Sequence, residues 1–476
     1  MKRTTDSELL SNKVFPIINW IDFSFNQKFF YKKTELTNDY IFLYATFLFY
    51  IVGNKDYSLD NALKAYLQNV LSKVLGELPE YNERLSVLRI QKHLLFGNKT
   101  DFRYLLISQI LYMFELLGIS AKENFKALLQ EKLLFKEKKF VKVLNCIINP
   151  SLITDKKINQ SFSGYLDFKK SLDSYKSLRI ANIGICATMS AGKSSFVNAL
   201  LGYDYLPVRN EATTARITRV YDNDHSQKLI GFTMNDSKLT NIENNLSEKD
   251  VDSWNSNSDI TRIFLQGDLD NIGNNGVVVA VHDTPGTNNS SDNTHHRITV
   301  DFLSSHKMDA IVFVVNSEHR CTTDEKALLK ELYEKVVFVQ NIPVIFVLNK
   351  ADSIDKEKES IDTAINQYKE YIAEIGFTNA KVLPVSAKAA RLLKMALKEK
   401  GDRFTESECD DFPSIVNKFT KRLVLDNSSA SYNNNSKVVV DGESYESSLL
   451  QTALVHTGIS KIEKEIEMIV KQEENK

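Results

Sequence analysis

Ala187-Thr-Met-Ser190-Ala-Gly192-Lys193-Ser194-Ser195 follows a predicted buried strand at residues 179–186 and precedes the helical pattern Phe-Val-Asn-Ala-Leu. A strand, a short loop with Gly-Lys-Ser and a helix predict a phosphate-binding loop, because backbone N–H groups and the helix N-terminus then face the phosphates. Lys193 would supply positive charge to the β and γ phosphates, and the Ser194 hydroxyl is placed to ligate Mg²⁺. The usual first glycine is Ala187 here, so an ordinary helix start is the alternative that other motifs must exclude.

A second motif, Asp283-Thr-Pro-Gly286, directly follows the apolar stretch 277–282. That stretch has the length and composition of a buried strand. A carboxylate at the end of a strand can hold the magnesium shell, and the N–H of Gly286 can reach a γ-phosphate.

A third motif, Asn349-Lys350-Ala-Asp352, follows the apolar stretch 344–348. The Asp352 carboxylate can accept hydrogen bonds from both N1–H and the exocyclic amine of guanine, whereas adenine offers no such pair. Loss of a paired polar contact in a buried site discriminates strongly between ligands. The motif therefore predicts selection of GTP over ATP, with the Lys350 stem covering the base.

A fourth motif, Ser386-Ala387-Lys388, follows the stretch 381–385, and a backbone N–H there can meet O6 of guanine. The four motifs occur in order, each at the end of a strand, which is where ligands bind in an open α/β sheet. This agreement excludes the ordinary helix start, and the sequence predicts a GTP-binding protein. From the charge balance described below, no nucleic-acid partner is expected.

Apolar strand-like runs alternate with helical patterns through the second part of the chain, which predicts a mainly parallel sheet with helices on both faces. We expect an α/β P-loop GTPase domain over residues 179–476. Gly458 to Val470 carries a helical apolar stripe, and we expect it to close the domain. Two polar stretches, near 222–258 and 426–436, are predicted as surface loops or insertions.

Residues 1–150 read as an all-α domain of unassigned role, and residues 151–178 as a linker with a lead-in helix. Residues 58–75 have helical spacing, with Ser58 as the expected N-cap. The longest apolar run, residues 40–52, is shorter than the roughly 20 residues of a membrane span. We expect a buried bundle helix there; the alternative is a helix that inserts into a membrane or binds a partner in one state.

The 60 basic and 61 acidic side chains nearly cancel, which excludes a protein that coats polyanions. Four widely spaced cysteines indicate no disulfide scaffold, and the amino terminus shows no secretory signal, so we expect a cytoplasmic location. Residues 122–142 hold seven Lys against three Glu. A solvated helix face is the simpler interpretation, and peripheral binding to an anionic membrane is the alternative.

The stretch 190–195 followed by Phe-Val-Asn-Ala-Leu-Leu-Gly resembles the dynamin superfamily, in particular bacterial dynamin-like proteins. Residues 206–215 resemble its first switch, residues 283–299 its second, and Thr322-Thr-Asp-Glu the helix after the next strand. The resemblance covers about 175–475. Members usually continue into a helical stalk, which is not recognisable here, so membrane remodelling does not follow from the resemblance.

The resemblance implies roles for several residues. Thr214, or its neighbour Thr213, would bind Mg²⁺ and position the attacking water, and Ser190 would act on the transition state with a monovalent cation, K⁺ or Na⁺. Thr287 replaces the water-orienting Gln of small GTPases, which implies slow basal turnover and stimulation by a second copy docking across the nucleotide. A regulatory GTP switch with incidental turnover is the competing hypothesis.

The predicted catalytic residues are Ser190, Lys193, Thr214 and Gly286, and the predicted metal ligands are Ser194, Thr214 and Asp283. The predicted nucleotide-binding residues are Ser190, Ala191, Gly192, Lys193, Ser194, Ser195, Thr213, Thr214, Asp283, Gly286, Asn349, Lys350, Asp352, Ser386, Ala387 and Lys388. The predicted partners are GTP or GDP, a second copy through the GTPase domains, and a protein or anionic membrane through residues 1–150.

Overall fold

The computed structural model describes residues 6–25, 44–45, 48, 52, 59–75, 100–118, 156–188, 190–207, 216–224, 226, 228–273, 276–285, 294–355, 357–398, 401–428 and 436–472. The chain divides into two compact units. The first combines Met1–Leu178 with Ser237–Asn244, and the second combines Arg179–Asp236 with Asn245–Lys476.

The second unit is built on a sheet whose strands lie in the order β3-β5-β2-β6-β1-β7-β8-β9. The neighbouring pairs β1–β7, β7–β8, β8–β9, β1–β6 and β2–β5 are parallel. The pairs β2–β6 and β3–β5 are antiparallel. The predicted mainly parallel sheet is therefore confirmed. The strands are β1 (Arg179–Ala187), β2 (Ile217–Asp222), β3 (Ile230–Asn235), β5 (Arg262–Gly267), β6 (Val277–Asp283), β7 (Ala310–Asn316), β8 (Val344–Asn349) and β9 (Lys381–Pro384).

The central strands are buried on both faces: every residue of β6 and of β7 is buried. That burial explains why their sequences are continuous apolar runs instead of alternating ones. The register pairs Ile185 of β1 with Asp283 of β6, and Asn316 of β7 with Asn349 of β8. The polar residues that follow the strands therefore meet at one edge of the sheet.

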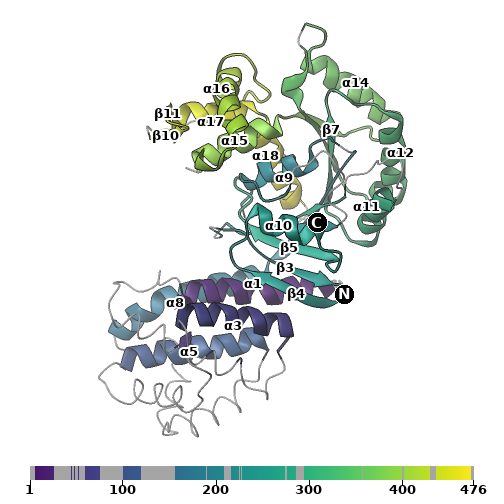
Figure 1. The fold of residues 1–476 in the computed structure, drawn as a ribbon. Helices are drawn as coiled ribbons and strands as arrows, with labels where there is room; N and C mark the ends of the chain where they lie inside the picture. Colours follow the sequence, from purple (N-terminus) through teal and green to yellow (C-terminus); the bar gives the residue numbers. More distant parts are fainter. Residues whose placement is uncertain are drawn as a thin grey trace. The chain divides into compact units, whose positions relative to one another are not determined.

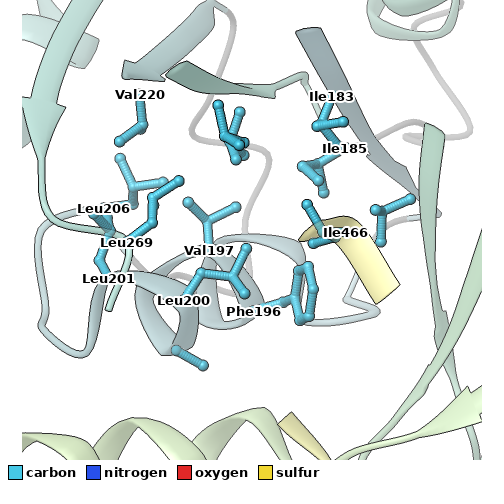
Figure 2. Close-up of a cluster of buried hydrophobic side chains, with 14 of the residues drawn as sticks. Ile183, Ile185, Phe196, Val197, Leu200, Leu201, Leu206, Val220, Leu269 and Ile466 are labelled. Carbon is cyan, nitrogen blue, oxygen red and sulfur yellow. The ribbon is translucent and has the colours of Figure 1, made fainter. Parts of the chain in front are cut away.

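Helices cover both faces of this sheet (Figure 1). On one face, α9 (Lys193–Leu201) and α18 (Ile459–Gln472) bury Phe196, Val197 and Ile466 against Ile183 and Ile185 of β1, as Figure 2 shows. The predicted apolar stripe of α18 is confirmed, since its Ile459, Ile462, Ile466 and Val470 are buried.

On the other face, α11 (Thr294–Ser305), α12 (Thr323–Leu332) and α14 (Ile361–Ala373) share a core with β7 and β8. A π-helix (Tyr333–Val337) and the short α13 (Phe338–Gln340) continue α12. A third core lies under α15 (Ala387–Leu397), α16 (Glu406–Lys421), α17 (Ser447–His456) and the hairpin β10 (Lys437–Val440)–β11 (Glu443–Glu446).

The polar stretch 222–258 is not a surface loop, which was one of the two predicted alternatives; that it is an insertion stays a prediction. It contains β3, β4 (Lys238–Glu243) and α10 (Glu248–Ser256), and it buries Phe232 and Trp254. Its abundant Asn, Asp and Ser sit at turns and caps, as at Ser247, whose side chain accepts from the N–H of Asp250 in a capping box. Within the second polar stretch, residues 429–435 lie outside the described residues.

The first unit contains α1 (Asp6–Phe25), α3 (Asn61–Leu75), α5 (Thr100–Leu117) and α8 (Lys156–Ser177), with β4 beside α3. Trp20 of α1 anchors its core: its ring meets Tyr112 edge-on with centroids 4.7 Å apart, and its Nε1–H donates to Tyr44 Oη at 3.1 Å. Among the described residues, no helix is both long and apolar enough to cross a membrane.

One sequence expectation in this unit changes, and a second agrees with the residues that the structure describes. Helix α3 begins at Asn61, and the carboxylate of Asp60 accepts from the N–H of Ala62 at 2.9 Å, so Asp60 takes the capping role expected of Ser58. Of the apolar run 40–52, the described residues Tyr44, Ala45, Leu48 and Val52 are helical and buried, as expected for a bundle helix. The remaining residues of that run lie outside the described ones.

Glu325, in the first turn of α12, makes folding pH-dependent. Its side chain is buried, and Tyr368 of α14 donates to its Oε1 at 2.8 Å. Burial raises the pKa of Glu325 from its ordinary 4.5 to about 7, and the Tyr368 hydrogen bond only partly opposes this. Because the pKa is higher in the folded state, folding stability falls as the pH rises from about 4.5 through about 7.

We predict that Glu325→Gln, which keeps an acceptor for Tyr368 but carries no charge, stabilises the protein at pH 8 by on the order of 1–3 kcal/mol more than at pH 5. Denaturant unfolding at the two pH values measures this difference. Glu370→Gln, on the exposed face of α14, is the matched control and should show no such difference. Equal effects of Glu325→Gln at both pH values would contradict the assignment.

Candidate functional site

The loop between β1 and α9 turns sharply to aim its backbone at the start of α9. Ser190 has φ 59°, and Gly192, the N-cap of α9, has φ 85°. A Cβ at Gly192 would lie 2.4 Å from Nδ2 of Asn349, so both the left-handed backbone and the space require glycine. The free N–H groups at the start of α9 form an anion site of the kind that binds phosphate.

Lys193 and Asp283 form a buried ion pair at the centre of the site, in which Nζ donates to Oδ1. Asp283 ends β6, and the next residue, Thr284, donates its hydroxyl to the carbonyl of Ile185 on β1 at 2.8 Å. Burial raises the pKa of the Asp283 carboxyl, and Lys193 opposes that shift. The pair holds the ammonium group beside the phosphate-binding loop.

The oxygen donors beside this pair fit a hard cation. The hydroxyl of Ser194 and the carboxylate of Asp283 are the donor types that Mg²⁺ prefers. Ser194 is the second residue of α9, and Asp283 contacts its neighbour Lys193. These two residues are therefore the described candidates for holding a magnesium ion.

Asn349, the last residue of β8, joins two of the sequence motifs through its side chain. Its Nδ2 donates to the carbonyl of Ala191 at 2.9 Å, and its Oδ1 accepts from the N–H of Ala387 at 3.1 Å. The side chain is buried, so both hydrogen bonds are shielded from water. One amide therefore fixes the distance between the phosphate-binding loop and the start of α15.

The backbone after Asn349 is held in a tight turn. Lys350 has φ 58°, and its carbonyl accepts from the Ser317 hydroxyl at 2.7 Å. The N–H of Ala351 donates to the carbonyl of Val385, at 3.1 Å. Asp352 follows in the 3₁₀ turn Ala351–Ser353, and Nζ of Lys418 on α16 donates to its carbonyl at 2.6 Å.

The loop after β9 is supported from the C-terminal helices. The N–H of Ser386 donates to the carbonyl of Thr457 at 3.0 Å. Gly458, with φ 86°, follows Thr457, and a Cβ there would lie 2.2 Å from the carbonyl oxygen of Pro384. This close approach of two backbones fixes Ser386 and Ala387, and it requires glycine at 458. Lys388 projects outward and pairs with Asp411 of α16 at 2.5 Å.

These loops surround a cavity of about 900 Å³, within the size range of small-molecule sites. Its phosphate side carries Gly192 and Ser195. Its other side carries three of the motif residues, Asn349, Lys350 and Asp352, and the loop after β9. The lining residues are Gly192, Ser195, Tyr203, Asp204, Ser247, Glu248, Lys249, Asn349, Lys350, Asp352, Ser353, Ser386, Ala387, Lys388, Arg391, Met395, Arg403, Thr405 and Glu408.

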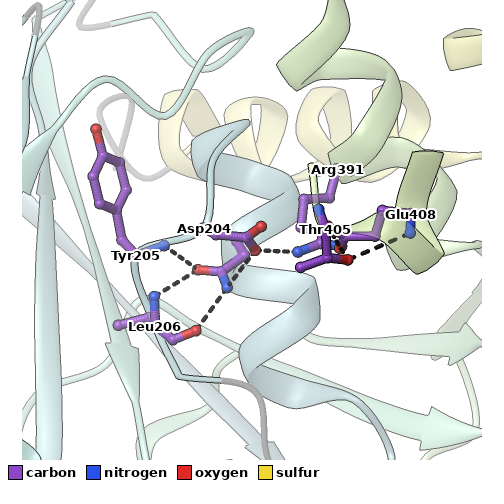
Figure 3. Close-up of polar contacts among 7 residues, drawn as sticks. Asp204, Tyr205, Leu206, Arg391, Thr405 and Glu408 are labelled. Atoms are coloured by element: carbon purple, nitrogen blue, oxygen red, sulfur yellow. Dashed lines mark hydrogen bonds and ion pairs between the residues drawn. The ribbon is translucent and has the colours of Figure 1, made fainter. Parts of the chain in front are cut away.

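A charged network that sequence reasoning missed lies along one wall of the cavity (Figure 3). Arg391 of α15 pairs with Asp204, in the turn after α9, and with Glu408 of α16. Glu408 also completes a capping box with Thr405. The Thr405-x-x-Glu408 spacing was the available sequence signal, but the chain distance from Asp204 to Arg391 gave no indication of their contact.

The structure brings eight predicted residues together around the cavity: Gly192, Ser195, Asn349, Lys350, Asp352, Ser386, Ala387 and Lys388. Lys193 and Asp283 meet each other beside it, and Ser190, Ala191 and Ser194 lie in the same loop and helix start. Thr213, Thr214 and Gly286 lie outside the described residues, so the choice between the two threonines stays open.

Comparisons with known proteins relate part of the chain to one family. Residues 183–351 match the model of the dynamin family. An uncharacterised protein encoded in the xynA 3′ region of Caldicellulosiruptor sp. (strain Rt8B.4) is 26% identical over 243 residues, which are 48% of this chain and 54% of that protein. The chain thus spans about half the length of the relative that it matches.

Solved structures that match this chain include a member of an oligomerised bacterial dynamin pair described as providing a mechanism for the long-range sensing and tethering of membranes. It is 18% identical, with 96% of this chain and 78% of that chain covered and a TM-score of 0.35. Era from Aquifex aeolicus bound to GDP and AlF4⁻ is 21% identical, with 46% and 56% covered and a TM-score of 0.27.

We predict that Asn349→Ala lowers both stability and affinity for guanine nucleotides. Each of its two buried hydrogen bonds contributes on the order of 0.5–1.5 kcal/mol, and removing the amide frees the phosphate-binding loop from α15. Denaturant unfolding of the nucleotide-free protein and titration with a fluorescent GDP analogue measure the two effects. Asn366→Ala, on the exposed face of α14, is the control. Unchanged affinity for the analogue would contradict the bridging role.

Proposed function

We propose that the protein, whose residues 183–351 match the dynamin family, binds GTP and hydrolyses it to GDP and phosphate in a Mg²⁺-dependent reaction. The observation that carries the proposal is the two-sided hydrogen bonding of Asn349. It joins the phosphate-binding loop to the start of α15 beside a cavity that Asp352, a carboxylate suited to guanine, also lines.

For hydrolysis, the protein must position a water molecule, align it with the γ-phosphate and neutralise the negative charge of the phosphates. Lys193 supplies a positive charge from its place at the start of α9, and the N–H groups there face the phosphates. Bound Mg²⁺, held by Ser194 and Asp283, would neutralise charge on the β and γ phosphates. Thr214, or Thr213, would orient the attacking water, and Gly286 would contact the γ-phosphate through its N–H.

Ser190 is the proposed transition-state contact, acting with K⁺ or Na⁺. Its left-handed backbone, φ 59°, places it at the turn of the loop, and the residue is exposed. An exposed position leaves it free to be covered by another surface. This observation supports coupling of hydrolysis to the docking of a second copy of the chain.

A homodimer through the GTPase domains is therefore part of the proposal. Thr287 stands where small GTPases have a water-orienting Gln, so a single domain leaves transition-state charge incompletely balanced. A second copy would exclude water from the site and strengthen the electrostatic contacts there. We also propose that the protein is cytoplasmic and that residues 1–150 bind a protein partner or an anionic membrane. A GTP switch with incidental turnover is the competing one.

We predict that the native protein binds GTP and GDP and has little affinity for ATP, and that Asp352→Asn exchanges guanine for xanthine preference. The amide offers a donor where the carboxylate offered only acceptors, and xanthine carries an acceptor there. Competition of GTP, XTP and ATP against a fluorescent GDP analogue measures the change. Asp362→Asn, exposed on α14, is the control. Native affinity for ATP equal to that for GTP would refute guanine recognition.

We further predict that the specific activity rises with protein concentration, because a dimer completes the site. A GDP–metal-fluoride complex should trap that dimer in light scattering, and GDP alone should release it. Lys193→Ala, which removes the phosphate-facing charge, is the inactive control. A mass of one chain in every nucleotide state, with constant specific activity, would favour the switch hypothesis instead.

A further inference from the structure

Lys418 approaches Asp352 from a helix that carries none of the nucleotide-binding motifs. Its Nζ donates to the carbonyl oxygen of Asp352 at 2.6 Å and lies 3.5 Å from Oδ2 of the same residue. The two side chains are partly shielded, with 38% of Lys418 and 26% of Asp352 exposed. One ammonium group therefore contacts both the backbone and the carboxylate of the residue expected to read guanine.

Helix α16 is a firm base for this contact. Its first turn is fixed by the capping box of Thr405 and Glu408, and Arg391 ties Glu408 to α15. Phe412, Val416 and Phe419 are buried in the core that α16 shares with α15 and α17. Lys418 lies between the last two of these anchors, so the origin of its side chain is well defined.

The two contacts have separate consequences. The bond to the carbonyl restrains the turn from Lys350 to Ser353. The positive charge beside Oδ2 restrains rotation of the carboxylate, whose χ2 torsion is otherwise broad. Guanine needs that orientation because it presents two parallel donors, N1–H and the 2-amino group, to the two carboxylate oxygens.

We propose that Lys418 is a positioning residue for guanine specificity, which orients the Asp352 carboxylate without touching the base. The inference rests on the proposed GTP binding. If Lys418 orients the carboxylate, it should contribute more to the affinity for a base with two donors than to the affinity for a base with one. Inosine triphosphate supplies that comparison, because hypoxanthine keeps N1–H and lacks the 2-amino group.

The test is the affinity of the native protein, Lys418→Ala and Lys418→Arg for GTP, GDP and ITP, measured by competition against a fluorescent GDP analogue. Lys418→Ala should weaken GTP and GDP equally, by roughly tenfold, the effect of losing one hydrogen bond to a charged group. The affinity for ITP should fall far less, so the preference for GTP over ITP should become smaller. Lys418→Arg should restore part of the preference.

Lys421→Ala is the matched control, since Lys421 lies on the same last turn of α16 and is exposed. It should leave all three affinities unchanged. Thermal unfolding of the nucleotide-free variants shows whether the packing of α16 has loosened. Lys418→Ala should have the same unfolding temperature as the native protein.

Equal weakening of GTP and ITP in Lys418→Ala would overturn the inference, because a loosened turn affects both bases alike. If the native protein selects GTP over ATP and Lys418→Ala has the same GTP-to-ITP preference as the native protein, only the inference about Lys418 is overturned. A native protein that binds ATP as well as GTP would overturn the proposed function and the inference together.

Discussion

The proposed nucleotide site depends on the side-chain amide of Asn349, which donates to the carbonyl of Ala191 and accepts from the N–H of Ala387. The two partners are separated along the chain by most of the sheet, and the amide is buried between them. A buried amide that satisfies donor and acceptor together is costly to displace, because either broken bond leaves an unpaired polar group. Gly192 follows from this constraint, since any Cβ there would meet the same nitrogen.

The base side of the site is stabilised by elements beyond the segment that matches the dynamin family, which ends at residue 351. Thr457 accepts from the N–H of Ser386, Gly458 passes close to Pro384, and Lys418 holds Asp352. The helices α16, α17 and α18 therefore belong to the architecture of the site. These helices fix the conformation of the turn around Asp352 and of the loop after β9, which are too short to fix their own conformation.

A buried charge cluster connects the same elements to the helix that starts at the phosphate-binding loop. Lys394 of α15 is fully buried, pairs with Glu463 of α18 and Asp270, and donates to the carbonyl of Leu200 at the end of α9. Attraction to both carboxylates raises the pKa of Lys394 despite its burial. Such groups add little net stability compared with apolar packing, but removal of one partner would leave an uncompensated charge. The cluster therefore fixes how α9, α15 and α18 pack.

The sequence by itself determined where the central strands end, and it predicted the residue types of the candidate site. Apolar runs fully buried in a parallel sheet are readable without tertiary context, and a motif such as Asn349-Lys-Ala-Asp352 carries its residue types in consecutive positions. Tertiary structure alone decided the contacts between distant segments, such as Lys418 with Asp352 and Arg391 with Asp204. It also turned the polar stretch 222–258 into strands and a helix. The physical reason is that those residues gain order from partners far along the chain, whose identity no local pattern encodes.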